Sequence, residues 1–378
     1  MQASIFLAGD YYTRRPVCLS STLAEKIGQH DFSIVNFEAP LDVDDEYRIR
    51  KVGPHLSQPS ESVTLLKQLG IDGVSLANNH IFDFGLQGLE KTIHELDAAA
   101  IAHFGAGTTF DEAYKPLQLN LNGIEVAIIA VADSEFGHYR YQDQTGGYAW
   151  INHQCVEDRI IKIKQSCDHV IVIAHTGAEM IDIPLPEWRD RYQRLCDCGA
   201  SAVIGHHPHV PQGYEQYQGS FIFYSLGEFF FDTTVPDPRR TASFAVSLEF
   251  THQDVTASII PHKHDGDTIS LDETVASNTR YQQLQHVLSE AEYWKHFDEI
   301  SQQLYRDLYQ KYYDLAIIGQ AADSSWLGKF RHTIKRLLSP QKYEAKYKTR
   351  SELLLLHNLR IDTHRYVVQR VLERKYKC

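Results

Sequence analysis

Several features that define common protein classes are missing from this 378-residue sequence. No stretch reaches the roughly 18 consecutive apolar residues that a membrane-spanning helix requires. The six cysteines are scattered and form no CxxC pair, so neither a disulfide scaffold nor a cysteine-based zinc site is indicated. The first residues, MQASIFLAGD, lack the basic region and the long apolar core of a signal peptide. We therefore expect a cytoplasmic protein with reduced thiols.

A surplus of positive charge is also missing, because the chain carries a net charge of -12 at pH 7. Proteins whose main partner is nucleic acid present basic surfaces, so no nucleic acid is expected as the main partner. The charge is unevenly distributed, since residues 326–378 hold 14 lysines and arginines against four acidic residues. The C-terminal end therefore differs in chemistry from the rest of the chain.

The sequence does contain an alternation of β-rich and helical patterns up to about residue 265. Candidate strands lie at residues 4–8, 32–36, 74–77, 126–132, 170–174, 201–204 and 221–224. Between several of them lie amphipathic patterns such as GLQGLEKTIHELDAAA, in which leucine and isoleucine recur on one helical face. Segments 244–250 and 255–260 have the pattern of a hairpin. This alternation predicts an α/β domain with buried sheets, and we assign it to residues 1–268.

The pattern changes after this domain, and residues 269–378 are predicted to form a helical C-terminal region with a basic tail. Apolar residues recur at intervals of three and four from Leu284 to Leu308, as on one face of a helix. Further along, WLGKFRHTIKRLL combines an apolar face with four basic residues. Such a helix suits peripheral contact with an anionic membrane surface, here the inner face of the membrane. A helix packed on the main domain with a solvated basic face has the same pattern, and both interpretations stay open.

Polar residues able to bind metals or move protons follow almost every candidate strand. Parallel strands end at one edge of a sheet, so the loops that follow them converge there. In chain order, these residues are Asp10, Glu38, Asn78, Asn79, His80, Asp83, His175, Glu179, His206, His207, His209 and Glu228. Any one of these motifs taken alone is common turn chemistry. Taken in order, each beside a strand, they indicate a metal site.

A dinuclear metal site explains why these residue types occur together. Two divalent cations a few ångströms apart need a bridging carboxylate, further oxygen and imidazole ligands, and open positions for water and substrate. Such a site lowers the pKa of bound water, so that hydroxide can attack an ester at neutral pH. A histidine that does not bind metal can then protonate the leaving group. Imidazole and carboxylate ligands suit manganese, iron or zinc, and two ions are expected.

The ordered motifs AGD, NFEAP, LANNHIFDFG, AHTGAE, IGHHPHVPQGYEQY and FYSLGEFFF resemble those of the CapA family. This family is named for capsule and poly-gamma-glutamate synthesis and is related to calcineurin-like metallophosphoesterases. The resemblance covers about residues 3–265. It implies a four-layer αββα metallophosphoesterase-like sandwich, with two sheets flanked by helices and a dinuclear metal site at one edge.

The resemblance also implies a role for each candidate residue. The implied metal ligands are Asp10 and His209 for the first ion, Glu38 as the bridging carboxylate, and Asn79, His175 and His207 for the second ion. His80, oriented by Asp83, would be the general acid, because such pairing fixes the tautomer of the imidazole and raises its basicity. The residues expected to support the ligands or to face the substrate are Asn78, Glu179, His206 and Glu228.

The sequence departs from the family pattern at three positions. Tyr12 stands where the wider phosphoesterase pattern has the histidine of Asp-x-His, so the first metal loses an imidazole ligand. Thr176 replaces a tryptophan, and Glu228 replaces the asparagine of an SLGNF block. The extra carboxylate of Glu228 can bind metal, repel an anionic substrate or select an amine-bearing one.

Two functional hypotheses fit these residues. The first is a divalent-metal-dependent, phosphoesterase-like hydrolase of capsule, exopolysaccharide or poly-gamma-glutamate-type polymer metabolism, with metal-activated hydroxide as nucleophile and His80 as proton donor. Its substrate would be a phosphoester or an anionic or peptide-like envelope polymer, and biosynthetic proteins would be its partners. The second is a non-catalytic, metal-stabilised assembly subunit of a polymer synthase. The tyrosine at position 12 favours the second hypothesis, whereas the pair of His80 and Asp83 favours the first.

Overall fold

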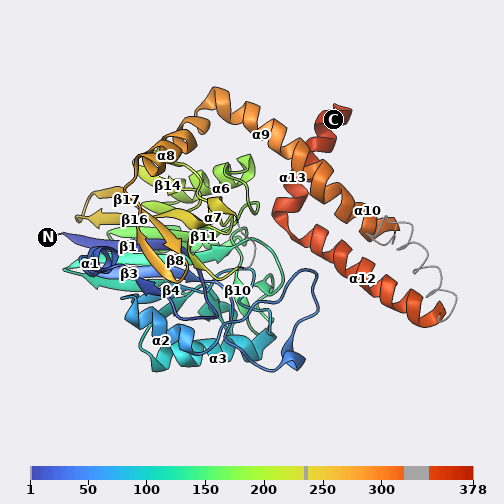
Figure 1. Ribbon diagram of the computed structural model, residues 1–378, viewed down its shortest axis with the longest axis horizontal. Helices are drawn as coiled ribbons and strands as arrows, with labels where there is room; N and C mark the ends of the chain where they lie inside the picture. The colour runs from blue at the N-terminus through green and yellow to red at the C-terminus, as the bar shows by residue number, and fades with distance from the viewer. Residues whose placement is uncertain (1, 234–236, 319–339, 378) are drawn as a thin grey trace. The chain divides into compact units, whose positions relative to one another are not determined.

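The computed structural model describes residues 2–233, 237–318 and 340–377 (Figure 1). The chain forms two compact units. The first comprises Met1–Ile49 and His55–Tyr293, and the second comprises Arg50–Pro54 and Trp294–Cys378. The sequence places its boundary after residue 268, whereas the first unit also includes β18 (Thr268–Leu271) and α8 (Val275–Val287).

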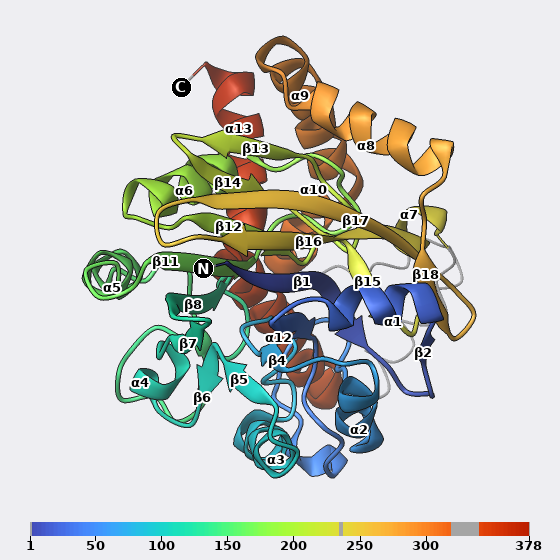
Figure 2. The same cartoon turned by 90° about the vertical axis from the view of Figure 1, so that its left-hand side faces the viewer.

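Two large sheets make up most of the first unit (Figure 2). Eight strands of the larger sheet follow the order β2 (Cys18–Leu19), β18, β17 (Val255–Asp265), β16 (Ala242–Phe250), β1 (Ala3–Tyr12), β3 (Phe32–Phe37), β4 (Gly73–Ser75) and β5 (Ala102–Phe104). A ninth strand, β15 (Glu228–Phe231), pairs with the last residues of β1. Because β1, β3, β4 and β5 run parallel, their carboxyl ends share one edge of the sheet.

The second sheet has six strands, and its four inner strands are parallel. Their order is β13 (Tyr214–Tyr217), β14 (Ser220–Phe223), β12 (Ala202–His206), β11 (His169–His175), β8 (Ile124–Ala132) and β7 (Leu117–Leu121). The sequences of β8 and β11 are nearly continuous apolar runs because both faces of each strand are buried. A small third sheet consists of β6 (Ala106–Gly107), β10 (Gly147–Ala149) and β9 (His138–Tyr139).

Amphipathic helices cover the outer faces of these sheets. They are α1 (Ser21–Gly28), α2 (Glu61–Gln68), α3 (Gly85–Ala98), α5 (Cys155–Ile163) and α6 (Pro186–Asp197). The first unit also contains the 3₁₀ turn η1 (Asp45–Tyr47) and the short helices α4 (Phe110–Ala113) and α7 (Pro238–Thr241). Helix α3 contacts β5 through a face that buries Leu89 and Leu96, and α6 contacts β12 and β14. Pro186 opens α6 without cost, because the first residue of a helix has no partner for its N–H. The predicted α/β sandwich is confirmed.

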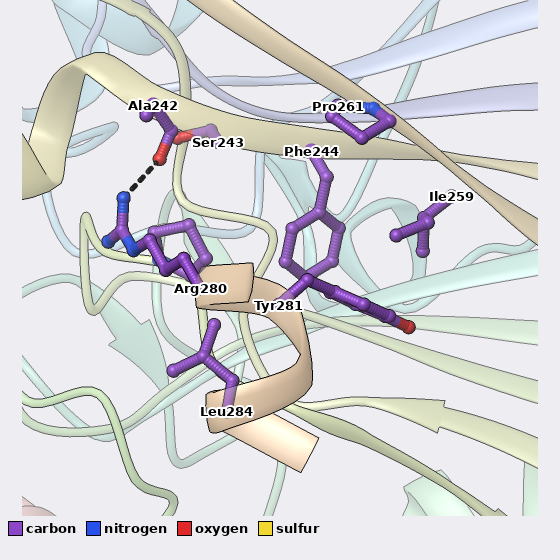
Figure 3. A pocket seen from close by; sticks show the side chains of 9 residues that line it. Ala242, Ser243, Phe244, Ile259, Pro261, Arg280, Tyr281 and Leu284 are labelled. Atoms are coloured by element: carbon purple, nitrogen blue, oxygen red, sulfur yellow. Dashed lines mark hydrogen bonds between the residues drawn. The ribbon is translucent and has the colours of Figure 1, made fainter. Parts of the chain in front are cut away.

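Helix α8 packs against β16 and β17 (Figure 3). Nη1 of Arg280 donates a hydrogen bond of 2.9 Å to the carbonyl oxygen of Ala242, and Tyr281 lies edge-to-face against Phe244. A cavity of about 30 Å³ remains beside Leu284, which is room for a water molecule and not for a substrate. This contact fixes α8 on the first unit.

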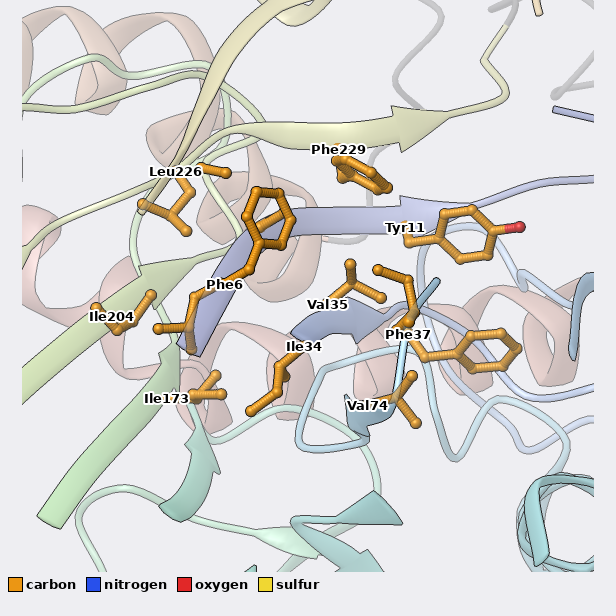
Figure 4. Packing of buried hydrophobic residues seen from close by; sticks show 14 of the residues in the cluster. Phe6, Tyr11, Ile34, Val35, Phe37, Val74, Ile173, Ile204, Leu226 and Phe229 are labelled. Carbon is orange, nitrogen blue, oxygen red and sulfur yellow. The ribbon is translucent and has the colours of Figure 1, made fainter. Parts of the chain in front are cut away.

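The two large sheets share one hydrophobic core (Figure 4). Phe6, Ile34 and Val35 of the larger sheet belong to the same buried cluster as Ile173 and Ile204 of the second sheet. Each fully buried side chain of this size contributes roughly 1.5–3 kcal/mol relative to an exposed one. The core therefore holds the strand ends of both sheets at fixed positions.

In the second unit, the described residues after Trp294 are mostly helical, whereas Arg50–Pro54 forms neither helix nor strand. Its elements are α9 (Glu290–Leu304), which begins in the first unit, the π-helical turn η2 (Tyr305–Tyr309), α10 (Gln310–Ile318), α12 (Pro340–Arg360) and α13 (Asp362–Tyr376). Within the described ranges, no helix combines the length and the apolar character that crossing a bilayer requires. The segment considered for membrane contact, residues 326–338, lies outside the described residues.

Candidate metal centre

The candidate residues lie where the strands of both sheets end. Asp10 lies inside β1, two residues before its end, and Glu38 directly follows β3. His175 and His206 are the last residues of β11 and β12, and these two strands are parallel and in register there. Glu228 opens β15, a strand that the sequence patterns do not predict, instead of following one. The candidate residues do lie together at strand ends, as expected. Glu228 differs from the others because it lies at the amino end of its strand and not at the carboxyl end.

The buried carboxylate of Asp10 contacts imidazoles from three positions. Its Oδ1 lies 3.6 Å from Nδ1 of His175 and 3.5 Å from Nδ1 of His206. Its Oδ2 lies 3.5 Å from Nδ1 of His209. Oδ1 also accepts a hydrogen bond of 2.8 Å from Nδ2 of Asn36. Asp10 is thus the residue through which the ends of β1, β11 and β12 meet.

A second set of contacts brings three carboxylates around His209. Its Nε2 lies 3.6 Å from Oε1 of Glu38, and its Nδ1 lies 3.3 Å from Oε1 of Glu228. One ligand atom from each of Asp10, Glu38 and His209 lies within 4.8 Å of the others, and all three residues are buried. This group has the donor types and the spacing of a divalent cation site.

A neighbouring group centres on His175. Its Nε2 lies 3.1 Å from Oδ1 of Asn79 and 3.1 Å from Nδ1 of His207. The backbone N–H of His207 donates a hydrogen bond of 3.3 Å to Oδ2 of Asp10, which links this group to the first one. Of the three residues proposed for the second ion, His175 therefore contacts both Asn79 and His207, beside the residues proposed for the first ion.

Two irregularities in β1 direct the Asp10 side chain into the centre. The pairing of β1 with β15 shifts register between Asp10 and Tyr11, and its pairing with β3 shifts between Leu7 and Asp10. Such bulges often re-aim a side chain beside a functional site. The preceding residue must be glycine, because a Cβ on Gly9 would lie only 2.0 Å from the carbonyl oxygen of Gly227. That close approach brings the start of β15, and with it Glu228, next to Asp10.

The loop after β12 holds two of its histidines in the left-handed region of the backbone. His207 has a φ of 95° and His209 a φ of 59°, and Pro208 lies between them. Residues with a Cβ rarely adopt such values, which cost about 1–3 kcal/mol each and persist where the surrounding structure enforces them. The sequence GHHPH thus forms a strained turn that presents its imidazoles to Asp10, Glu38 and His175.

The protonation of this cluster follows from burial and from its crowded charges. Burial alone would raise the pKa of Asp10, but its contacts with His175 and His206 hold that pKa well below the usual value. Burial, reinforced by the charge of Asp10, raises the pKa of Glu38 well above the usual value. Burial lowers the pKa of His175 to about 4. Burial also opposes a charge on His209, but the carboxylates of Glu38 and Asp10, together with Glu228, outweigh burial and raise its pKa to about 10.

His80 and Asp83 form a buried pair next to the cluster. Nδ1 of His80 lies 2.7 Å from Oδ2 of Asp83, which also accepts a hydrogen bond of 2.8 Å from the backbone N–H of Leu56. Oδ1 of Asn78 accepts the backbone N–H of His80 at 3.2 Å, and its Nδ2 donates to the carbonyl oxygen of Phe37 at 2.9 Å. Asn78 therefore ties the loop after β4 to the end of β3, which carries Glu38.

The structure adds two residues that the sequence analysis did not select. Nδ2 of Asn36 donates to Oδ1 of Asp10 and lies 3.2 Å from Nδ1 of His175, so Asn36 contacts both side chains. Arg240 of α7 donates from Nε to Oε1 of Glu228 at 2.8 Å, and its Nη2 contacts the same oxygen. Asn36 ends a predicted strand two residues before Glu38, which is a usable signal, whereas nothing in the DPRRT segment marks Arg240.

A family model described as "Bacterial capsule synthesis protein PGA_cap" matches residues 7–233. The chain belongs to this family. This match confirms the membership predicted from the motifs. The matched segment contains every proposed metal ligand and ends before Arg240.

Two relatives carry related names. The capsule biosynthesis protein CapA of Bacillus anthracis is 29% identical over 276 residues, which cover 71% of this chain and 67% of the relative. The PGA biosynthesis protein CapA of Bacillus subtilis (strain 168) is 32% identical over 203 residues, which cover 53% of each chain. The match thus spans between about half and two thirds of these relatives.

Solved structures with a similar arrangement include two from Thermus thermophilus. A hypothetical protein aligns with a TM-score of 0.44 at 18% identity, covering 69% of this chain and 100% of that one. A 5'-nucleotidase precursor aligns with a TM-score of 0.41 at 12% identity, covering 75% of this chain and 57% of that one.

The donor atoms of this capsule-family chain fit divalent metal ions. Both carboxylate oxygens of Glu38, Oε2 of Glu228, and Nδ1 of both His206 and His209 are buried without a hydrogen-bond partner among the described residues. Buried polar atoms of this kind are costly unless a partner such as a metal ion satisfies them. Tyr12 has no imidazole to offer, and its buried ring packs against Phe231 with ring centroids 4.8 Å apart. The cluster therefore fits metal ions held by the other donors.

Proposed function

We propose that this chain is a divalent-metal-dependent, phosphoesterase-like hydrolase of the capsule or poly-glutamate type of envelope-polymer metabolism that its relatives are named for. The observation that supports catalysis most directly is the pair of His80 and Asp83, 2.7 Å apart and adjacent in sequence to Asn79. A site that only stabilises the fold needs its metal ligands and has no use for a carboxylate-oriented imidazole beside them.

In this proposal Asp10 and His209 would hold one ion, and Asn79, His175 and His207 would hold the other. Glu38 would contribute to holding both ions, a role supported by its two buried oxygens without hydrogen-bond partners among the described residues. Bound divalent ions would supply a water of lowered pKa as nucleophile and would stabilise negative charge on the attacked group.

The other residues of the site would orient the substrate or the metal ligands and transfer protons. Asp83 takes the Nδ1–H of His80, so Nε2 of the same ring is the atom that carries a proton to the leaving group. The Glu179 side chain reaches solvent, and although partial desolvation opposes its ionisation, nearby imidazoles of His207, His209 and His80 lower its pKa. It would therefore orient an electropositive part of the substrate or a ligand imidazole. An anionic or peptide-like polymer, a phosphoester within it, and biosynthetic proteins are the partners we propose.

The test is hydrolysis of an aryl phosphodiester and an aryl phosphomonoester by metal-stripped protein resupplied with manganese, zinc or iron. We expect metal-dependent turnover that falls by about 100-fold or more in His80→Ala, the range of general acid catalysis. His252→Ala is the matched control, since His252 is half-exposed and contacts only Asp168 among the ion pairs described.

Metal content separates the outcomes of this experiment. A loss of turnover in His80→Ala with unchanged metal content supports the proton-donor role. Tight metal binding with no turnover of either ester, in wild type and variant alike, contradicts the phosphoesterase proposal.

A non-catalytic assembly subunit of a polymer synthase is the second candidate. It is favoured by Tyr12, which replaces a ligand imidazole with a packed aromatic ring. Binding of an envelope polymer or of a synthase without any bond cleavage would support this candidate.

A further inference from the structure

The second unit contains a cavity of about 440 Å³ that lies outside the family-matched segment. It is formed by α9, the π-helical turn η2, the start of α10 and the end of α13. Ligand sites in proteins commonly fall between about 300 and 1,000 Å³, so this cavity is large enough for more than a single ion.

Positive charge dominates the lining of this cavity. Four basic side chains line it, namely those of Arg306, Arg370, Arg374 and Lys375, against one carboxylate, that of Asp298. Arg374 forms an ion pair with Asp298. The guanidinium of Arg370 stacks over the ring of Phe297 at 4.8 Å, which fixes its plane. A basic cavity in a chain of net charge -12 favours an anionic ligand.

An independent observation points to a ligand in the same place. Ser301 lines the cavity, is 2% exposed, and its Oγ has no hydrogen-bond partner among the described residues. A buried hydroxyl is costly when its hydrogen bond is not made. A ligand oxygen in the cavity would accept the hydroxyl hydrogen.

The π-helical turn adds a structural reason for the position of the cavity. Tyr305–Tyr309 interrupts the α-helical pattern between α9 and α10, and two of its residues, Tyr305 and Arg306, line the cavity. Single π-helical turns are rare and occur frequently at functional sites, because they shift side chains out of the ordinary helical register.

We propose that this cavity binds an oligoanion, a molecule with two or more carboxylate or phosphate groups. Guanidinium groups bind both kinds of oxyanion through paired N–H donors, and a fixed guanidinium loses little entropy in doing so. The volume, and the three basic side chains that remain once Asp298 pairs with Arg374, favour a ligand with more than one anionic group. This inference does not depend on the metal centre, since every lining residue belongs to the second unit.

The test measures binding of three probes to the full-length chain by calorimetry: penta-glutamate, penta-glutamine and tripolyphosphate. The variant Arg306→Glu is compared with Lys311→Glu, which makes the same change of charge. Both side chains are exposed, and Lys311 lies on α10 outside the cavity, where its Nζ donates to the carbonyl oxygen of Asp307. We expect Arg306→Glu to weaken binding at least 10-fold and Lys311→Glu to change it less than 2-fold.

Each outcome of these binding measurements supports or overturns the oligoanion proposal. Binding of penta-glutamate but not of tripolyphosphate identifies a carboxylate site, and the reverse identifies a phosphate site. Equal weakening by both variants, equal binding of penta-glutamine, or no binding of any probe overturns the proposal. Hydrolysis by the metal centre, measured on the same Arg306→Glu sample, should be unchanged, so failure here is distinguishable from failure of the proposed function.

Discussion

At the scale of single residues, the metal centre places three buried carboxylates around one imidazole. Asp10, Glu38 and Glu228 all lie within 3.6 Å of His209. Like charges at such separations repel strongly in a poorly solvated site, so they persist only with compensating cations. Arg240 compensates Glu228, and His209 compensates part of the rest. Glu38 is therefore the carboxylate whose negative charge is least compensated by neighbouring cations.

Replacing Glu38 by glutamine should therefore act oppositely on the metal-free and metal-loaded protein. Because burial and Asp10 raise the pKa of Glu38, the metal-free wild type loses stability as pH rises above about 4, where the unfolded chain ionises this group. Glu38→Gln removes that loss, so its metal-free form should be more stable at pH 7 by ~1–3 kcal/mol, with the gap closing toward pH 4. Denaturant unfolding of stripped protein across this pH range measures it.

The metal-loaded comparison is the internal control for that experiment. Glu38→Gln should lower metal content and remove most of the stabilisation that metal gives to the wild type. A variant that binds metal as tightly as the wild type would rule out a bridging role for Glu38.

The pair of Glu228 and Arg240 should behave as a coupled unit. The Glu228 side chain is fully buried and that of Arg240 is 12% exposed. Arg240→Ala leaves a buried carboxylate without its partner, which costs about 3–5 kcal/mol. The double variant Glu228→Asn with Arg240→Ala should cost less than Arg240→Ala alone, because the asparagine typical of the family pattern needs no cation. Additive losses in unfolding free energy would contradict this coupling.

The side chains of the site could be predicted from the sequence because their types and order form a recognisable pattern. Asp10, Glu38 and His209 stand in motifs that precede or follow apolar runs, and the structure brings them together. Arg240 could not be predicted, since its role depends on a carboxylate 12 residues away that it meets only when α7 packs against β15. The assignment of each residue to an ion stays a prediction.

At the scale of elements, the centre depends on how closely two backbone segments approach. Gly9 in β1 meets Gly227 at the start of β15, where Asp10 N–H donates to the carbonyl oxygen of Gly227 at 3.0 Å. No side chain fits between them, so a Cβ must push β15 away from β1. Any such shift moves Glu228 relative to Asp10.

Two alanine substitutions test this dependence. Gly9→Ala should destabilise the protein by about 3 kcal/mol or more, as expected for overpacking against a rigid backbone, and should lower metal affinity. Gly28→Ala is the matched control, because a Cβ there meets nothing within 4 Å and Gly28 ends helix α1. It should stabilise by roughly 0.5–1 kcal/mol. Equal thermal shifts in the two variants would refute the close-approach argument.

The long apolar strands could be predicted from the sequence, and so could the short strand β4, whereas β5 and β15 could not. Strands β8 and β11 stand out because both faces are buried and the apolar runs are continuous. Strand β15 spans four residues and β5 spans three, so neither contains enough residues to establish a period. Strand β15 exists because β1 offers it a free edge beyond the residues that pair with β16.

At the scale of the whole molecule, every proposed metal ligand belongs to the first unit. A ligand that binds only the folded state stabilises the unit that holds it by about 2.7 kcal/mol at 100 times its dissociation constant. Adding metal to stripped protein should therefore raise the melting temperature of the first unit and leave that of the second unchanged. Scanning calorimetry with and without metal measures both transitions. A shift in both transitions, or in neither, would contradict this assignment.

The position of β1 also matters while the protein is being made. One edge of β1 is paired by β3, but the other is completed by β16 at residues 3–7 and by β15 at residues 10–12. At translation rates of about 5–20 residues per second, the wait between synthesis of β1 and of residue 250 is on the order of 10–50 s. During that time the nascent chain presents an unpaired apolar strand edge, the kind of surface on which chains associate wrongly. Correct folding of this protein therefore depends on keeping this edge of β1 free of wrong partners until β15 and β16 have been synthesised.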